Sequence, residues 1–258
     1  MADRVQTSEN EPKSDLYAGK NTVAEGLKAG IVFDTVYVSA RTGAVSPLID
    51  KCVAQGAVVK QVHPAKLDAM AGGANHQGIV AVASCVAVST LDDIFDAAQR
   101  SGEPPLILIA DCVQDPHNLG ALIRSAECAG AHGVIVPKHR SAVLGGVVGK
   151  SSAGAAAHIA VVKVTNLAAT IKELQQRGVW IYGADMDGAM YFDTDLTGAT
   201  AIVIGSEGSG LGRLVKDCCD AVVAIPLAGK VNSLNASVAG GILLFEAAAQ
   251  RLKKKKRV

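Results

Sequence analysis

The feature that most constrains the fold is a series of short, unbroken apolar segments in the second half of the chain. They are separated by stretches with helical periodicity, and they read "LILIA", "GVIVP", "HIAVV", "VWIYGA", "AIVIG" and "AVVAIPL". A strand that is apolar on both faces must be covered on both faces, as in a parallel sheet with helices on either side. The chain is therefore predicted to be an α/β protein whose second half forms a parallel sheet and ends in a long amphipathic helix from Asn235 to about Leu252.

A smaller unit with its own alternation of strands and helices precedes this sheet. Strands are predicted at 34–40, 57–62 and 78–88, with a helix at 64–70 before the last of them. The segment "STLDDIFDAAQRSGEPP" then has the pattern of a helical connector that ends at a Gly/Pro break. We predict four parts: a disordered N-terminal segment at 1–15, a small α/β domain at 16–88, a linker at 89–105, and the parallel-sheet domain with its basic tail at 106–258.

The composition indicates a globular chain and excludes several classes of protein. Hydrophobic residues make up 49% of the chain and charged residues 19%, which is the balance of a folded domain rather than of a disordered segment. No apolar run reaches the roughly 18 residues that a membrane span requires, and the polar start lacks the features of a signal peptide. We therefore expect a cytoplasmic protein without membrane association. The six cysteines form no CxxC pair and have no histidine at zinc spacing, so no metal site is expected.

Basic residues gather at the C-terminal end of the chain. The formal net charge is only +1, but the last eight residues, "RLKKKKRV", include six lysines or arginines. Any affinity for nucleic acid must therefore be local rather than spread over the surface. The basic run either contacts phosphate or is the solvated end of the last helix, where the helix dipole favours cations.

Glycines are concentrated in one loop, "GSEGSGLGRL", directly after the apolar "AIVI". A strand that ends in glycines and leads into a helix often cradles a nucleotide-like ligand. A dinucleotide site would follow the first strand and have an acidic residue about 20 positions further on, and a P-loop would need GxxxxGK[ST]; the sequence has neither. From this loop alone, a glycine turn with a purely structural role is also a possible interpretation. Three other polar loops follow predicted strands, namely "DCVQDPHNLGALIRSAE", "PKHRSA" and "PLAGKVNSLNAS", and in a parallel sheet such loops meet at one edge.

Taken together, these loops resemble the motifs of the SpoU-type RNA 2′-O-ribose methyltransferases of the SPOUT superfamily. The family's three motifs are matched, in order, by "DPHNLGALIRSAECAGAHGVIVPKHRSA", "IVIGSEGSGLGRLV" and "IPLAGKVNSLNASVAGGILLFE". The N-terminal unit, which ends in "HQGIVA", resembles the small ribosomal-protein-like RNA-binding domain of the 23S rRNA guanosine-2′-O-methyltransferase group. The resemblance implies a trefoil knot in the C-terminal domain, S-adenosylmethionine as cofactor, RNA as partner with a guanosine of large-subunit rRNA as substrate, and a homodimer packed through the C-terminal domain.

The resemblance also implies roles for individual residues. Those implied in catalysis are Asn118, Arg124, Glu207, Ser233 and Asn235. Those implied in holding the cofactor are Gly205, Ser206, Glu207, Gly208, Ile225, Leu227, Leu234 and Ala236. Arg124 is expected to anchor a phosphate and to stabilise the alkoxide that develops on the ribose. The role of base suits it less well, because a guanidinium does not readily lose a proton.

Each of these residues also has a structural interpretation. Asn118 and Asn235 would serve as helix N-caps, and Arg124 would lie on a helix surface. His117 and His139 are less favoured as bases, since surface histidines are common. Two other functions stay open as well: a tRNA 2′-O-methyltransferase, which the N-terminal domain argues against, and a catalytically silent RNA-binding or ribosome-assembly protein, which the intact set of polar motif residues argues against.

Overall fold

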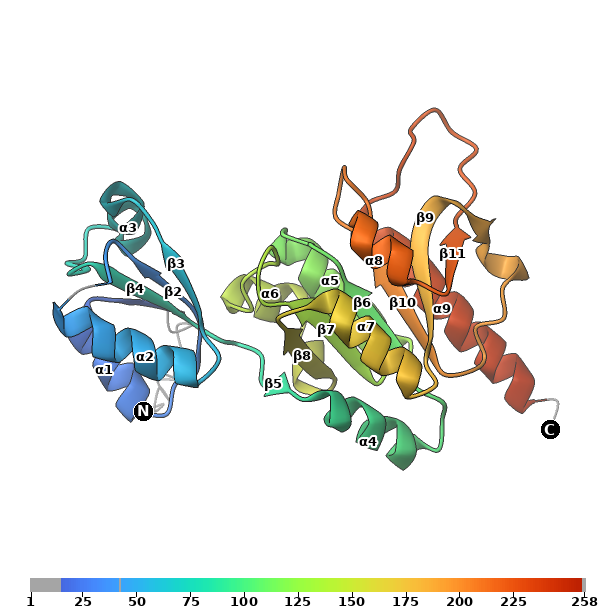
Figure 1. The fold of residues 1–258 in the computed structure, drawn as a ribbon, viewed down its shortest axis with the longest axis horizontal. Coiled ribbons are helices and arrows are strands. Elements are labelled where there is room, and N and C mark those ends of the chain that lie inside the picture. The colour runs from blue at the N-terminus through green and yellow to red at the C-terminus, as the bar shows by residue number, and fades with distance from the viewer. Residues whose placement is uncertain (1–14, 42, 257–258) are drawn as a thin grey trace, which may run out of the picture. The chain divides into compact units, whose positions relative to one another are not determined.

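The chain folds into two compact units. The computed structural model describes residues 15–41 and 43–256, and its contacts divide the chain between Ser84 and Cys85. Figure 1 shows that each unit has its own sheet. The segment 89–105, expected as a linker, contains α4 (Leu91–Ser101), whose buried Ile94 packs in a core of the second unit. The disorder expected at 1–15 concerns residues that, apart from Asp15, lie outside the described part of the chain.

The N-terminal unit is a four-stranded mixed sheet in the order β1-β4-β2-β3. Its strands are β1 (Leu16–Ala18), β2 (Phe33–Val38), β3 (Val58–Gln61) and β4 (Ile79–Ala83), and its helices are α1 (Lys20–Lys28), α2 (Ser46–Ala54) and α3 (Pro64–Ala71). β2 runs parallel to β3 and antiparallel to β4. Phe33 and Val36 of β2 pack with Ile49 and Ile79 in the core of this unit. Because β2 is central and wholly buried, it organises the unit.

The strand predicted at 78–88 is wrong in its extent. β4 ends at Ala83, and Val88 belongs to β5 (Val88–Ser89) in the other sheet. The backbone hydrogen bonds explain the division: the Ser84 amide donates to Val32 in the first unit, whereas the Cys85 amide donates to Leu144 in the second. The apolar run is continuous in sequence but passes from one unit to the other.

The C-terminal unit contains a seven-stranded sheet in the order β11-β9-β10-β6-β7-β8-β5, and every neighbouring pair is parallel. Its further strands are β6 (Leu106–Ala110), β7 (Gly133–Pro137), β8 (Ala160–Val164), β9 (Trp180–Met190), β10 (Thr200–Ile204) and β11 (Ala221–Ala224). Its further helices are α5 (Pro116–Cys128), α6 (Gly146–Ser151), α7 (Leu167–Gln176), α8 (Arg213–Cys218) and α9 (Ala236–Lys255). The predicted α/β class and parallel sheet are confirmed.

Helices cover both faces of this sheet, as the unbroken apolar strands require. Along β6, Leu108 belongs to a core shared with α5, α6 and α9, whereas Ile107 and Ile109 belong to a core shared with α4, α7 and α8. Figure 1 shows the sheet between these two sets of helices. Successive side chains of a strand point to opposite faces, so each strand contributes to both cores.

The last helix is fastened at its C-terminal end by Arg251. This side chain is 9% exposed and donates hydrogen bonds to four backbone carbonyls, those of Pro104, Pro105, Leu196 and Gly198. These carbonyls lie in the loops that precede β6 and β10. Arg251, the first cation of the basic run, is therefore a buried structural residue and not a phosphate ligand.

The lysines that follow Arg251 are in part engaged as well. Lys254 donates to the Thr197 hydroxyl, and Lys255 forms an ion pair with Glu103. α9 runs to Lys255, three residues beyond the predicted end of the last helix. Contact of Lys253 or Lys256 with phosphate stays a prediction, and Arg257 lies outside the described residues.

Candidate cofactor-binding and catalytic site

A cavity of about 520 Å³ opens at the carboxyl ends of β10 and β11, beside residues 184–186 of β9. This is the edge of a parallel sheet where ligands bind. Two loops line it: the glycine loop after β10, and the segment 225–235 that joins β11 to α9. All of the residues expected to hold the cofactor line the cavity, namely Gly205, Ser206, Glu207, Gly208, Ile225, Leu227, Leu234 and Ala236.

The glycine loop is closed on itself. The amide of Ser206 donates to the carbonyl of Gly210 at 3.0 Å, and the amide of Gly210 donates back at 3.0 Å. Gly208 and Gly210 have φ values of 89° and 64°, which a side chain would strain. A Cβ on Gly205 would lie 2.2 Å from the carbonyl carbon of Gly210. Glycine at 205 is therefore required for the loop to close, before any ligand is considered.

Three polar side chains from different segments meet beside the cavity. The Asn118 and Asn235 amide groups each donate to Glu207 Oε1 at 2.7 Å, and Asn235 also donates to Asn118 Oδ1 at 2.9 Å. Asn118 is 7% exposed, whereas Glu207 is exposed toward the cavity that it lines. The hydrogen bonds to Oε1 fix the carboxylate, and Oε2 has no hydrogen bond to the described residues.

The structure supports the interpretation as a helix cap for Asn235 but not for Asn118. Asp115, not Asn118, caps α5, because its side chain accepts from the His117 amide. Asn235 does cap α9: its Oδ1 accepts from the amides of Ser237 and Val238. Its Nδ2 at the same time binds Glu207. Asn235 is thus both a structural cap and a member of the polar cluster.

The structure does not bring Arg124 together with the cavity. Ser233 lines the cavity, as expected, but Arg124 does not. Arg124 and Asn118 are six residues apart on α5, so they point in directions about 120° apart around the helix. Arg124 is exposed and has no hydrogen bond or ion pair with the described residues. Neither His117 nor His139 lines the cavity.

One wall of the cavity is formed by residues that are not among those expected from the sequence. β9 pairs with β11 at Gly183, and the pairing resumes only at Ala189, so residues 184–188 form an excursion from the ladder. Asp185 and Met186 of this excursion line the cavity. The available signal was "GADMDGA", which places acidic residues and glycines at the end of an apolar strand.

The cavity is acidic. Its lining includes two charged side chains among the described residues, Asp185 and Glu207, and both are carboxylates. Lys216 of α8 donates to Asp185 Oδ2 at 2.7 Å, and this hydrogen bond holds the pKa of Asp185 below its usual value. The same lysine lies 3.8 Å from Asp187. The apolar side chains of Ile225 and Leu234 face the same space, so the cavity suits a ligand with an aromatic base at one part and positive charge at another.

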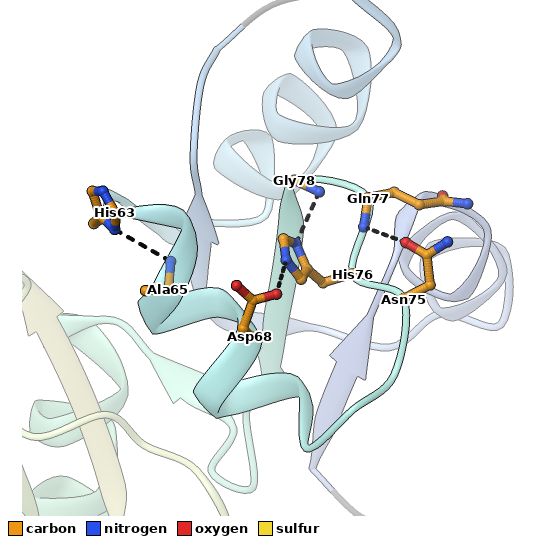
Figure 2. Close-up of polar contacts among 7 residues, drawn as sticks. All are labelled: His63, Ala65, Asp68, Asn75, His76, Gln77 and Gly78. Carbon is orange, nitrogen blue, oxygen red and sulfur yellow. Dashed lines mark hydrogen bonds and ion pairs between the residues drawn. The ribbon is translucent and has the colours of Figure 1, made fainter.

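The N-terminal unit holds a second, exposed polar feature, the loop 72–78. His76 Nδ1 accepts from the Gly78 amide at 3.0 Å, and its Nε2 lies 3.0 Å from Asp68 of α3. The Gln77 amide donates to Asn75 Oδ1. Figure 2 shows His76 turned toward α3, while the side chains of Asn75 and Gln77 lie on the other side of the loop. The loop is thus fastened to the unit with exposed amide groups on its outer side.

No helix in the described part of the chain is long and apolar enough to cross a membrane. The same residues contain no cluster of His, Cys, Asp and Glu side chains that could bind a metal ion.

Comparison with known proteins agrees with both units. Residues 105–245 match the SpoU rRNA Methylase family, and residues 17–86 match the family described as RNA 2′-O ribose methyltransferase substrate binding. The chain is 43% identical over 240 residues to a putative TrmH family tRNA/rRNA methyltransferase of Bacillus subtilis, covering 92% of this chain and 96% of the relative. It is 42% identical over 244 residues to a 23S rRNA (guanosine-2′-O-)-methyltransferase of Ralstonia nicotianae, covering 93% and 97%.

Solved structures bear on the cofactor. The SpoU methyltransferase AviRb from Streptomyces viridochromogenes, in complex with S-adenosylmethionine, is similar with a TM-score of 0.58 and 26% identity, over 92% of this chain and 90% of that one. An rRNA methyltransferase from Sinorhizobium meliloti with the same cofactor has a TM-score of 0.55 and 25% identity, over 91% and 86%. The chain therefore belongs to the SpoU family of RNA 2′-O-ribose methyltransferases, which take their methyl group from S-adenosylmethionine.

Proposed function

We propose that the protein methylates the 2′-hydroxyl of a guanosine in large-subunit rRNA, and that it acts in the cytoplasm. The supporting observation is the extent of one similarity: the Ralstonia relative, whose name specifies this reaction, matches 93% of the chain, including the N-terminal unit. A tRNA-modifying enzyme from Aquifex aeolicus is similar over only 63% of the chain. The N-terminal unit is therefore the feature that favours rRNA over tRNA.

In the proposed mechanism, Glu207 receives the ribose hydroxyl. When bound, S-adenosylmethionine supplies an electrophilic methyl group. Asn118 and Asn235 hold Oε1 of Glu207, which leaves Oε2 to accept a hydrogen bond from the 2′-hydroxyl. A carboxylate in this position orients the hydroxyl and favours loss of its proton as the new bond forms. Arg124, exposed and without a partner among the described residues, binds an RNA phosphate next to the ribose.

The choice of substrate is tested by incubating the purified protein with labelled methyl donor and either 23S rRNA or total tRNA. We expect label in rRNA, recovered after nuclease digestion as 2′-O-methylguanosine. Label in tRNA alone would establish the alternative substrate, and label in neither, with the cofactor still bound, would favour the silent RNA-binding protein.

The N-terminal unit is proposed to bind the RNA. A fragment that begins at Cys85 retains β5 and the buried Val86 of the second unit, so it is expected to fold. Its affinity for S-adenosylmethionine should equal that of the full chain, while its affinity for rRNA should fall by about tenfold or more, because the phosphate contacts of the first unit are lost. Filter binding and calorimetry measure the two affinities. Equal RNA affinity of fragment and full chain would show that the first unit does not hold the substrate.

We also propose that two copies of the chain associate through α9. Three apolar side chains of this helix, Val238, Phe245 and Leu252, are 49%, 51% and 58% exposed. They recur every seven residues and so lie along one side of the helix. Apolar side chains aligned on an exposed helix face are typical of a protein–protein interface.

The substitution Phe245→Asp tests this association. A buried aromatic anchor replaced by a charge is expected to weaken a dimer by about 100-fold or more, which sedimentation velocity would detect as a shift to monomer. Leu214→Asp is the matched control, because Leu214 is 67% exposed but lies on α8, on the opposite face of the sheet. If the wild-type protein is a monomer at micromolar concentration, α9 is not an interface between copies.

A further inference from the structure

We infer that Asp185 makes the cavity selective for the charge of its ligand, so that it binds S-adenosylmethionine more tightly than the demethylated product. On methyl transfer the sulfonium sulfur keeps the electron pair of the broken C–S bond and becomes a neutral thioether, while the ribose hydroxyl gives up its proton. The product, S-adenosylhomocysteine, therefore carries one positive charge less than the donor but has nearly the same shape. A site that senses charge distinguishes the two.

The position of Asp185 is fixed by the excursion from β9. The excursion leaves the ladder after Gly183 and rejoins it at Ala189. At its end, Gly188 lies so close to the neighbouring strand that a Cβ would be 2.5 Å from the backbone of Val222. The hydrogen bond from Lys216 holds the carboxylate itself. Asp185 is thus held rigidly at the cavity wall, and its side chain is only 23% exposed.

The net charge around this wall is negative even when Lys216 is included. Lys216 does not line the cavity, and it is shared between Asp185 at 2.7 Å and Asp187 at 3.8 Å. One lysine cannot neutralise two carboxylates, and Glu207 adds a further negative charge on the lining. No basic side chain of the described residues lines the cavity to offset them. Partly desolvated carboxylates attract a cation more strongly than they would in bulk water.

The acidic wall acts differently on the methyl donor and on the demethylated product. The donor is attracted by the acidic wall, and after transfer the product has lost the charge that the wall attracts. Product release is thereby favoured without any change in the shape of the site. The selectivity depends only on the cofactor of the family and not on which RNA is methylated.

The test is calorimetry of the full-length protein with each of the two ligands, in the absence of RNA. Asp185→Asn keeps the shape of the side chain and removes its charge. We expect it to weaken S-adenosylmethionine about five- to tenfold, the scale of one partly solvated charge pair, and to change S-adenosylhomocysteine by less than about twofold. Asp92→Asn is the matched control: it also removes a carboxylate that is paired with a basic side chain, Arg177 at 2.9 Å, but Asp92 is 81% exposed and does not line the cavity, so both affinities should stay unchanged.

A second variant guards against a folding defect in the first. Met186 lines the cavity and is 61% exposed, so Met186→Glu adds a negative charge with little risk to the fold. It should raise the preference for S-adenosylmethionine over S-adenosylhomocysteine. Equal weakening of both ligands by Asp185→Asn would mean that Asp185 binds a group they share and would overturn charge selection, as would unchanged affinities. Since no RNA is present, these outcomes leave the rRNA assignment untouched, and transfer to tRNA would leave this inference untouched.

Discussion

Arg124→Ala is expected to lower the single-turnover rate of methyl transfer to an rRNA fragment by about 100-fold or more, because an RNA whose phosphate is not anchored presents its ribose out of line with the methyl group. Arg124 is exposed on α5 and has no partner among the described residues, so its removal should leave the fold and the cofactor affinity unchanged. Its planar guanidinium can bind a phosphate through two hydrogen bonds. Arg124→Lys should therefore restore little of the rate, because a point charge does not reproduce that geometry.

Lys172→Ala is the control for this experiment. Lys172 is also an exposed cation on a helix, but α7 covers the opposite face of the sheet from α5. Its rate should match the wild type. If the rate of Arg124→Ala is within about threefold of the wild type, Arg124 is a residue of the helix surface and the proposed role of its guanidinium fails.

Arg251→Met is expected to lower the free energy of unfolding by about 3 kcal/mol or more, because four carbonyl oxygens, one in a buried and three in partly buried hydrogen bonds, then lose their donor. The carbonyls of Pro104 and Gly198 each accept from Arg251 at 2.6 Å. They belong to the loops before β6 and β10, two adjacent strands near the middle of the sheet. The substitution should therefore loosen the end of α9 and both loops together.

Urea denaturation followed by circular dichroism measures the change. Lys253→Met is the matched control, since Lys253 lies two residues further along the same helix and is exposed; its unfolding free energy should change by less than about 0.5 kcal/mol. A loss below about 1 kcal/mol in Arg251→Met would show that water replaces the guanidinium at these carbonyls.

The strands of the C-terminal unit could be predicted because each is apolar throughout. β6 and β7 begin and end at the residues expected from "LILIA" and "GVIVP". The same property misled at 78–88, where hydrophobicity continues across the boundary between the two units. An apolar pattern indicates that a residue is buried, but it does not indicate which sheet the residue joins. That depends on hydrogen-bond partners distant in sequence, Val32 for Ser84 and Leu144 for Cys85.

The same distinction applies to the site. The motif residues around the cavity were predictable because the resemblance supplied them as a set, and the strand order brings their loops to one edge of the sheet. Asp185 belongs to no such motif, and its position depends on an interruption of the β9–β11 pairing. Arg251 was grouped with its basic neighbours, because sequence alone does not show that one cation in such a run is buried. The trefoil knot stays a prediction from the resemblance.

The Asn235 side chain makes hydrogen bonds with both its oxygen and its nitrogen, and this restricts which amino acids position 235 can accept. Its side-chain oxygen binds amides at the start of α9, and its side-chain nitrogen donates to a carboxylate. Aspartate would cap the helix equally well but would repel Glu207, and serine would cap it without reaching across. Only a short side chain with an acceptor and a donor on the same carbon meets both demands. A substitution at position 235 must therefore satisfy two requirements together: the cap of α9 and the hydrogen bond to Glu207.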